Sequence, residues 1–210
     1  MADSSNKTKI FIFGAQGQAK MALNIVKKTP EQWSFSGNIT TENEEAFLAE
    51  HHENTAIFIA LGENWTRQEI YQKTKDKGFT FPPLIHPSAL VASDVSLGQG
   101  TIVMPGAIIN TGSTIGDFCV INSGSIVEHD CHIDDFCSVA PGAVICGSGQ
   151  IKKGAYIGAN ATISQNLTIG EWSVIGAGGV VINPIAPNTI NVGVPTKEIA
   201  QKKKSDTVLL

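Results

Sequence analysis

The chain has 210 residues, a formal net charge of −4 at pH 7 and 42% hydrophobic residues. A negative net charge argues against nucleic-acid binding, for which a basic surface is typical. No apolar run approaches the roughly 20 residues that a membrane-spanning helix needs, and the first ten residues lack the apolar segment of a signal peptide. We therefore expect a cytoplasmic protein without a membrane span, whose four cysteines are free thiols.

Residues 1–82 predict a small Rossmann-like α/β domain. Short apolar runs rich in β-forming residues indicate buried parallel strands, and they alternate with segments of helical spacing. The predicted strands are Lys9–Phe13, Trp33–Phe35 and Ala56–Leu61, and the predicted helices are Gln18–Lys28, Glu44–His51 and Asn64–Lys77.

A glycine-rich turn, Gly14–Gln18, joins the first predicted strand to the first helix. Glycines let a ligand approach the backbone, and the N–H groups of a helix start face anions. The turn is not a complete G-x-G-x-x-G motif, so a tight connection without a ligand is the alternative. Gly14, Asn38 and Gly62 all follow predicted strands, and ligands of parallel sheets bind beyond those carboxyl ends. We expect a ligand site at this edge.

From Ile85 to Val181 the sequence repeats every six residues, with Ile, Val or Leu at seventeen successive steps. This period differs from the 3.6 of a helix and the 2 of a strand, and it is typical of a parallel β-helix. Three hexads form one triangular coil, so residues 18 apart stack on neighbouring coils. We expect the β-helix to span residues 83–196, followed by a tail at 197–210, with Thr196–Lys204 as a candidate helix.

Because the inward aliphatic ladder carries no chemistry, we looked for reactive side chains that face outward. His129 lies two residues after an inward position and precedes Asp130, and the 18-residue register places it between Thr111 and Gly147. An imidazole is a natural general base at neutral pH, and a glycine beside it leaves room for a substrate. The alternative is an ordinary surface histidine among acids. His129 and His132 lack a third metal ligand, so we expect no metal.

The chain resembles the bacterial nucleotide-sugar acetyltransferases over residues 9–196. The resemblance lies in KIFIFGAQGQAK at 9–20, LIHPSALV at 84–91, INSGSIVEHD at 121–130 and NVGVP at 191–195. The most similar type is the PglD, NeuD and perosamine acetyltransferase group, which implies a left-handed β-helix and a homotrimer with active sites between subunits. It also implies acetyl-CoA as co-substrate and acetylation of a UDP-type 4-amino-4,6-dideoxy sugar for bacterial surface glycans.

The same resemblance implies roles for individual residues. The catalytic set is His129 as base, Asp130 to tune it and Asn122 near the reacting amine. The acetyl-CoA contacts are Ser138, Gly147, Ala159 and Ala177, and the nucleotide-sugar contacts are Gln16, Gly17, Gln18, Asn38 and Gly62.

The chain departs from the family pattern at three places. Gly17-Gln18 stands where Gly-His is common, Gly37-Asn38-Ile39 replaces an acidic pair that grips uracil, and Ser138 replaces a histidine that reaches the acetyl group in a close relative. These departures leave the nucleotide open. Two alternatives also stay open: O-acetylation of a sugar such as a sialic acid, and a non-catalytic β-helical binding module.

Overall fold

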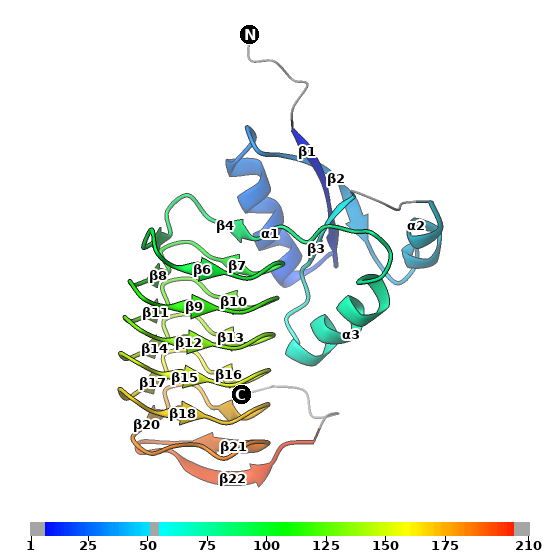
Figure 1. Ribbon diagram of the computed structural model, residues 1–210. Helices are drawn as coiled ribbons and strands as arrows, with labels where there is room; N and C mark the ends of the chain where they lie inside the picture. The colour runs from blue at the N-terminus through cyan, green and yellow to red at the C-terminus, as the bar shows by residue number, and fades with distance from the viewer. Residues whose placement is uncertain (1–6, 51–54, 204–210) are drawn as a thin grey trace.

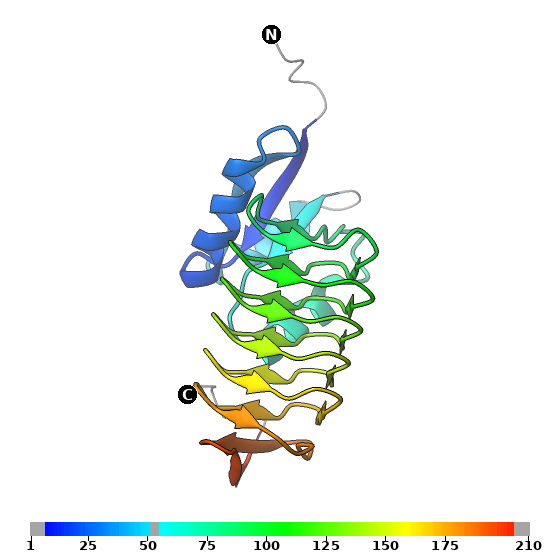
Figure 2. The same ribbon diagram turned by 90° about the vertical axis from the view of Figure 1, so that its left-hand side faces the viewer.

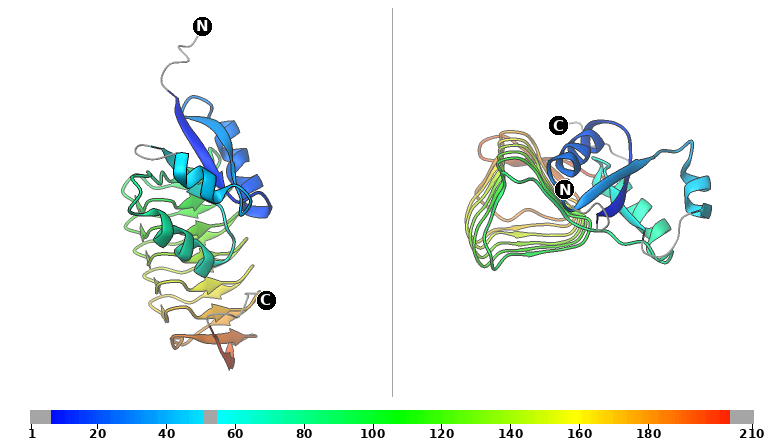
Figure 3. Two further views of the ribbon diagram at one scale, coloured as in Figure 1. Left: turned by 90° about the vertical axis from the view of Figure 1, so that its right-hand side faces the viewer. Right: turned by 90° about the horizontal axis from the view of Figure 1, so that it is seen from above.

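A small α/β domain lies beside a tall prism of stacked coils in the computed structural model, which describes residues 7–50 and 55–203 (Figure 1). Seen from above, the prism has a triangular outline, and the N-terminal domain lies beside one of its corners (Figure 3). The expected combination of a small parallel sheet with a left-handed β-helix is confirmed. Within the described residues no helix is long and apolar enough to cross a membrane.

The N-terminal sheet has three parallel strands in the order β2-β1-β3. Its strands are β1 (Thr8–Phe13), β2 (Trp33–Ile39) and β3 (Ala56–Ile59), and its helices are α1 (Gly17–Lys28), α2 (Glu44–Glu50) and α3 (Asn64–Thr74). β2 is longer than predicted, so Asn38 pairs with Ile12 inside the sheet rather than following the strand. The predicted end of the second helix, His51, lies outside the described residues.

The prism is built from two-residue strands that form three parallel sheets, named here the B, C and D faces. The B face contains β4 (Leu84–Ile85), β7 (Ile102–Val103), β10 (Val120–Ile121), β13 (Ser138–Val139), β16 (Tyr156–Ile157) and β19 (Val174–Ile175). The C face contains β5 (Leu90–Val91), β8 (Ile108–Ile109), β11 (Ile126–Val127), β14 (Val144–Ile145), β17 (Thr162–Ile163) and β20 (Val180–Val181). The D face contains β6 (Ser96–Leu97), β9 (Thr114–Ile115), β12 (His132–Ile133), β15 (Gln150–Ile151) and β18 (Thr168–Ile169).

The second residue of each strand points inward, and these residues form the core of the prism. From Val103 to Val181 the ladder is buried in one apolar cluster, which also takes in Cys119, Cys131 and Cys137. The first step, Ile85, is 39% exposed because no coil lies above it. The described cysteines are all free, so packing accounts for the three buried ones.

The C-terminal segment corrects one prediction. Where a helix was expected over Thr196–Lys204, the chain forms a strand, β22 (Lys197–Gln201), which pairs antiparallel with β21 (Thr189–Val192). β21 extends the B face at the base of the prism, and its outer edge would otherwise leave backbone groups unpaired. Covering that edge favours the strand over a short, poorly amphipathic helix.

The two domains share their packing. Apolar side chains of the B face, among them Leu84, Ile102 and Val120, belong to the same cluster as Ile10 and Ile12 of β1. A second shared cluster surrounds the turns between the D and B faces, where it includes the aromatic residues Phe13, Phe47, Phe79, Phe81, Phe118 and Phe136. These shared clusters hold the N-terminal domain in a defined position on the prism.

Candidate functional site

A cleft of about 910 Å³ opens where β1 and β3 end and α1 and α3 begin. Gln16, Gly17, Gln18 and Gly62 line it, so the structure brings together four of the five residues expected to bind the nucleotide sugar. Gly14 is required beneath them, because its φ is +112° and a Cβ there would lie 2.9 Å from the Ala60 carbonyl oxygen. The first turn of α1 thus presents its N–H groups to the cleft.

Asn38 has a different position. Its side-chain amide donates to the Gly14 carbonyl oxygen at 2.6 Å and so supports the glycine turn, while the cleft wall is made by residues further along the chain. Glu42 and Glu44 line this wall, and Glu44 lies 3.7 Å from the Lys73 ammonium. β2 ends at Ile39, four residues beyond its predicted end, so the residues that follow the strand and reach the cleft are Glu42 and Glu44 rather than Asn38.

The His129 side chain stands at the turn between the C and D faces, called here the C–D corner. Its Nδ1 lies 2.9 Å from an Asp130 carboxylate oxygen, and both side chains are exposed, at 58% and 65%. Asp130 adopts a left-handed φ of 58°, a conformation that aspartate tolerates better than most residues. With Nδ1–H donating to Asp130, the lone pair is left on Nε2, and the ring is set for proton abstraction.

Gly147 lies directly against this ring, as the 18-residue register predicted. A Cβ on Gly147 would lie 2.7 Å from both Cε1 and Nε2 of His129, so a larger residue would displace the imidazole. The next residue, Ser148, donates its backbone N–H to the His129 carbonyl oxygen at 2.9 Å. The Gly147 N–H has no hydrogen-bond acceptor among the described residues.

Three further predicted site residues lie at another corner of the same prism, the B–C corner between the B and C faces. Ala159 and Ala177 stack there on neighbouring coils, where the Gly178 N–H donates to the Ala159 carbonyl oxygen at 2.8 Å. Asn122 lies at the same corner and accepts the Ser123 N–H at 2.8 Å. The whole C face separates them from His129 within one subunit.

Ser138 does not face the solvent as an acetyl-CoA contact would. It is 4% exposed beneath α3, and its hydroxyl donates to Asn64 at 2.6 Å. An Arg67 nitrogen donates to the same hydroxyl at 3.1 Å. These partners belong to the domain interface, so the geometry of Ser138 favours a role there over the expected contact with the acetyl donor.

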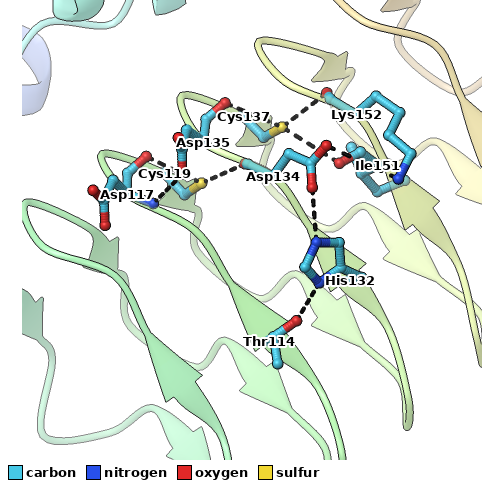
Figure 4. A network of polar contacts seen from close by, with 9 residues as sticks. All are labelled: Thr114, Asp117, Cys119, His132, Asp134, Asp135, Cys137, Ile151 and Lys152. Carbon is cyan, nitrogen blue, oxygen red and sulfur yellow. Dashed lines mark hydrogen bonds and ion pairs between the residues drawn. The ribbon is translucent and has the colours of Figure 1, made fainter.

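His132 is engaged on the D face, as the close view shows (Figure 4). Its Nε2 lies 2.8 Å from an Asp134 oxygen, and its Nδ1 is hydrogen-bonded to the Thr114 hydroxyl. Lys152 lies 4.0 Å from the other Asp134 oxygen. Both ring nitrogens therefore have partners, and among residues 7–50 and 55–203 no group of three His, Cys, Asp or Glu side chains is placed to hold a metal.

The outward side of the C face carries a feature that the inward ladder does not predict. The first residue of each strand points outward, and on the C face these residues are aliphatic in five of six coils: Leu90, Ile108, Ile126, Val144 and Val180. The equivalent D-face residues are polar: Ser96, Thr114, His132, Gln150 and Thr168. This stripe was visible in the sequence one position before each ladder step. The C face, which is turned to the viewer in Figure 2, lies away from the N-terminal domain.

The six-residue repeat and its left-handed β-helix are the features that this chain shares with known proteins. The family model described as bacterial transferase hexapeptide (six repeats) matches residues 112–147, which include His129 and Gly147. Over nearly its whole length the chain further shares the two-part architecture of sugar N-acetyltransferases.

That likeness is carried by solved structures. PerB from Caulobacter crescentus, in complex with CoA and GDP-perosamine, superposes with a TM-score of 0.85 at 29% identity, covering 91% of this chain and 97% of PerB. The acetyltransferase domain of PglB from Neisseria gonorrhoeae FA1090, in complex with acetyl coenzyme A, gives 0.85 at 29% identity, covering 92% and 100%.

Matches to curated sequences cover a smaller part of the chain. The serine acetyltransferase of Escherichia coli (strain K12) is 44% identical over 57 residues, which is 27% of this chain and 20% of that protein. The galactoside O-acetyltransferase of the same strain is 39% identical over 56 residues, which is 27% of this chain and 28% of that protein. The chain thus matches between 20% and 28% of the length of these two relatives.

Proposed function

We propose that this protein transfers an acetyl group from acetyl-CoA to the amino group of a nucleotide-linked amino sugar. The observation that carries the proposal is the C–D corner, where Asp130 holds His129 at Nδ1 and Gly147 lies against Nε2. The nucleotide would bind in the N-terminal cleft, with its phosphates at the start of α1. The complexes of PerB with CoA and GDP-perosamine and of PglB with acetyl coenzyme A support both substrates.

In the proposed reaction the sugar nitrogen attacks the thioester carbon, and His129 Nε2 removes the proton that the nitrogen must lose. The Gly147 N–H donates to the oxyanion of the tetrahedral intermediate. The carbon–sulfur bond then breaks, and the proton passes from the imidazolium to the departing CoA sulfur. Because the sugar nitrogen attacks the thioester directly, no covalent enzyme intermediate is formed. A positioned base contributes about 10²–10⁴-fold to the rate.

We propose that the site is completed by a neighbouring subunit in a homotrimer. The aliphatic C face is bounded on one edge by the C–D corner with His129 and on the other by the B–C corner with Asn122, Ala159 and Ala177. If three C faces turn toward a threefold axis, the C–D corner of each prism meets the B–C corner of the next. This packing buries the stripe and brings the two half-sites together.

The proposal is tested by following thiol release from acetyl-CoA with a panel of UDP-, GDP- and dTDP-linked amino sugars. We expect activity with at least one of them and a loss of about 10²–10⁴-fold in His129→Ala. His132→Ala is the matched control, because His132 is a similarly exposed histidine paired with an aspartate. Near-normal turnover in His129→Ala would reject the assignment. Activity only on sugar hydroxyls would instead indicate an O-acetyltransferase.

The assembly is tested by Ile126→Glu, which places a charge in the middle of the C face. We expect a trimer for the unmodified protein and a smaller species for the variant in analytical ultracentrifugation. Thr168→Glu on the D face is the control, because it adds the same charge where the outward side chains are polar. A monomeric parent protein would contradict the shared site.

A further inference from the structure

We infer that Arg67 is a positioning residue, which fixes the nucleotide cleft at one height on the β-helix and so sets its separation from the acetyl-transfer corner. The inference rests on the proposed function for its catalytic consequence. Arg67 lies on α3 and is 1% exposed, the largest side chain in the described protein that is buried to this degree. Nothing in its local sequence distinguishes it from a surface helical arginine.

The Arg67 guanidinium joins the two domains by direct hydrogen bonds. Nη1 donates to the carbonyl oxygens of Leu61 at 3.0 Å and Gly62 at 2.9 Å, and both residues line the cleft. On the other side, Nε donates to the Phe118 carbonyl oxygen at 3.0 Å, and Nη2 donates to those of Phe136 at 3.2 Å and Cys137 at 3.3 Å. One planar group thus links the cleft loop to two successive coils.

Asn64 extends the link to a third coil. Its Oδ1 accepts from Arg67 Nη2 at 3.0 Å, and its Nδ2 donates to the carbonyl oxygens of Gly154 at 3.0 Å and Ala155 at 3.2 Å. The Ser138 hydroxyl bonds to both Asn64 and Arg67. Arg67, Asn64 and Ser138 are called here the interdomain clasp.

The buried charge of the Arg67 guanidinium favours a role in specifying how the domains dock, in addition to any role in stability. Burial lowers the pKa of Arg67 to about 10, so the group stays cationic at pH 7. Its hydrogen-bond partners are carbonyls, an amide and a hydroxyl, with no carboxylate among them. Buried charges are often no more stabilising than apolar side chains of equal volume, and their best-attested use is to specify register.

A β-helix creates a particular need for register, because its surface repeats with every coil. Apolar contacts are not directional, so they define the height of the domain less sharply than hydrogen bonds do on a surface whose coils follow one another about every 4.8 Å. The clasp removes this ambiguity, because Ser138 is flanked on the B face by Val120 above and Tyr156 below. If the domain docked one coil higher or lower, Val120 or Tyr156 would face Arg67 and Asn64 in place of Ser138, and neither side chain has a small hydroxyl at that position.

The test compares two acceptors for the same acetyl transfer: a nucleotide-linked amino sugar and the same amino sugar without its nucleotide. We expect Arg67→Met to lower kcat/KM for the nucleotide-linked acceptor about 10–100-fold, since a misplacement of about 1 Å can cost about 10²-fold. The rate with the free amino sugar, which does not depend on the cleft, should change little. Arg67→Lys should behave similarly, because an ammonium cannot reach both sides of the interface.

Thr74→Val is the matched control. Thr74 is buried on the same helix and donates to the Ile70 carbonyl oxygen at 2.8 Å, outside the clasp. It should lower the unfolding temperature and leave the ratio of the two acceptor rates unchanged. If Arg67→Met also leaves that ratio unchanged, the positioning role is rejected.

A distance measurement tests the docking without any activity. Spin labels at Glu45 in the N-terminal domain and Gln150 on the D face, diluted with unlabelled chain, should give one narrow distance distribution. Arg67→Met should broaden or shift it, and an unchanged distribution would overturn the inference. A parent protein that acetylates no acceptor would reject the proposed function alone, because the distance result stands apart from it.

Discussion

The β-helix and the N-terminal domain reach stability in different ways. The core of the prism consists of its own ladder, from Val103 to Val181, with the small residues between the steps. Both apolar clusters of the N-terminal domain, by contrast, include side chains from the prism, such as Met104 in one and Phe118 in the other. Each coil of the prism buries its apolar side chains against the coils above and below it. A three-stranded sheet with short helices is too small to do this alone, so it buries apolar side chains against the prism.

The same difference holds for the two parts of the proposed site. The C–D corner is positioned by backbone bonds between successive coils, as in the Ser148 N–H to the His129 carbonyl. The cleft is positioned by side chains, chiefly Arg67 and Asn38. The corner is therefore a property of the repeat, and the cleft is a property of how the domains meet.

The largest expected effect comes from separating the two regions. A fragment ending at Pro82 should be unfolded, because it loses the prism side of both clusters, whereas one beginning at Pro83 should keep the circular dichroism of a β-helix. The second fragment exposes the apolar B face and should need a mild detergent to remain in solution. A cooperatively folded 1–82 fragment would contradict the asymmetry.

Phe118→Ala should weaken the packing of the N-terminal domain against the prism and leave the inward aliphatic ladder of the prism intact. Phe118 is fully buried and lies 4.5 Å from Tyr71 and 5.4 Å from Phe136 between ring centroids. Truncating a buried phenylalanine costs about 3–5 kcal/mol. We expect thermal unfolding to split into an early transition of the N-terminal domain and a later one of the prism. Phe35→Ala, at a residue that is 38% exposed, should show a single transition near the original temperature.

Gly147→Ala should damage the site and spare the fold. The new methyl would meet the His129 ring at 2.7 Å and turn it away, which should lower kcat about 10–100-fold if the ring is the base. Gly124→Asn is the control, because a Cβ added at Gly124 would have no neighbouring atom within 4 Å and asparagine already occupies the equivalent left-handed position at Asn160. Full activity in Gly147→Ala would show that the ring position is unimportant.

The smallest effect concerns His86, at the junction of the two regions. Burial, with Lys28 nearby, lowers the pKa of His86, and its Nδ1 accepts the Ser88 N–H at 3.1 Å, which requires the neutral ring. The unfolded chain therefore binds the proton more readily, and the free energy of unfolding should fall as the pH drops below the unfolded value of about 6.5. Denaturant titrations at two pH values should show a smaller difference in His86→Gln.

The sequence by itself determined the prism and the corner on it. A six-residue period converts residue number into position, so Gly147 could be placed against His129 by counting 18 residues. The glycine turn and Gly62 were also predictable, because strand ends in a parallel sheet share one edge. These features depend on local repetition or on a rule of topology.

Only the tertiary structure decided what happens between distant segments. Asn38 turns to Gly14, Ser138 lies under α3, and β22 closes an edge where a helix was expected. Arg67 is buried by carbonyl groups 51 to 70 residues away, a distance over which no periodicity carries information. The physical reason is that hydrogen-bond partners across an interface depend on how the two domains pack together. The sequence of either domain alone does not contain that arrangement.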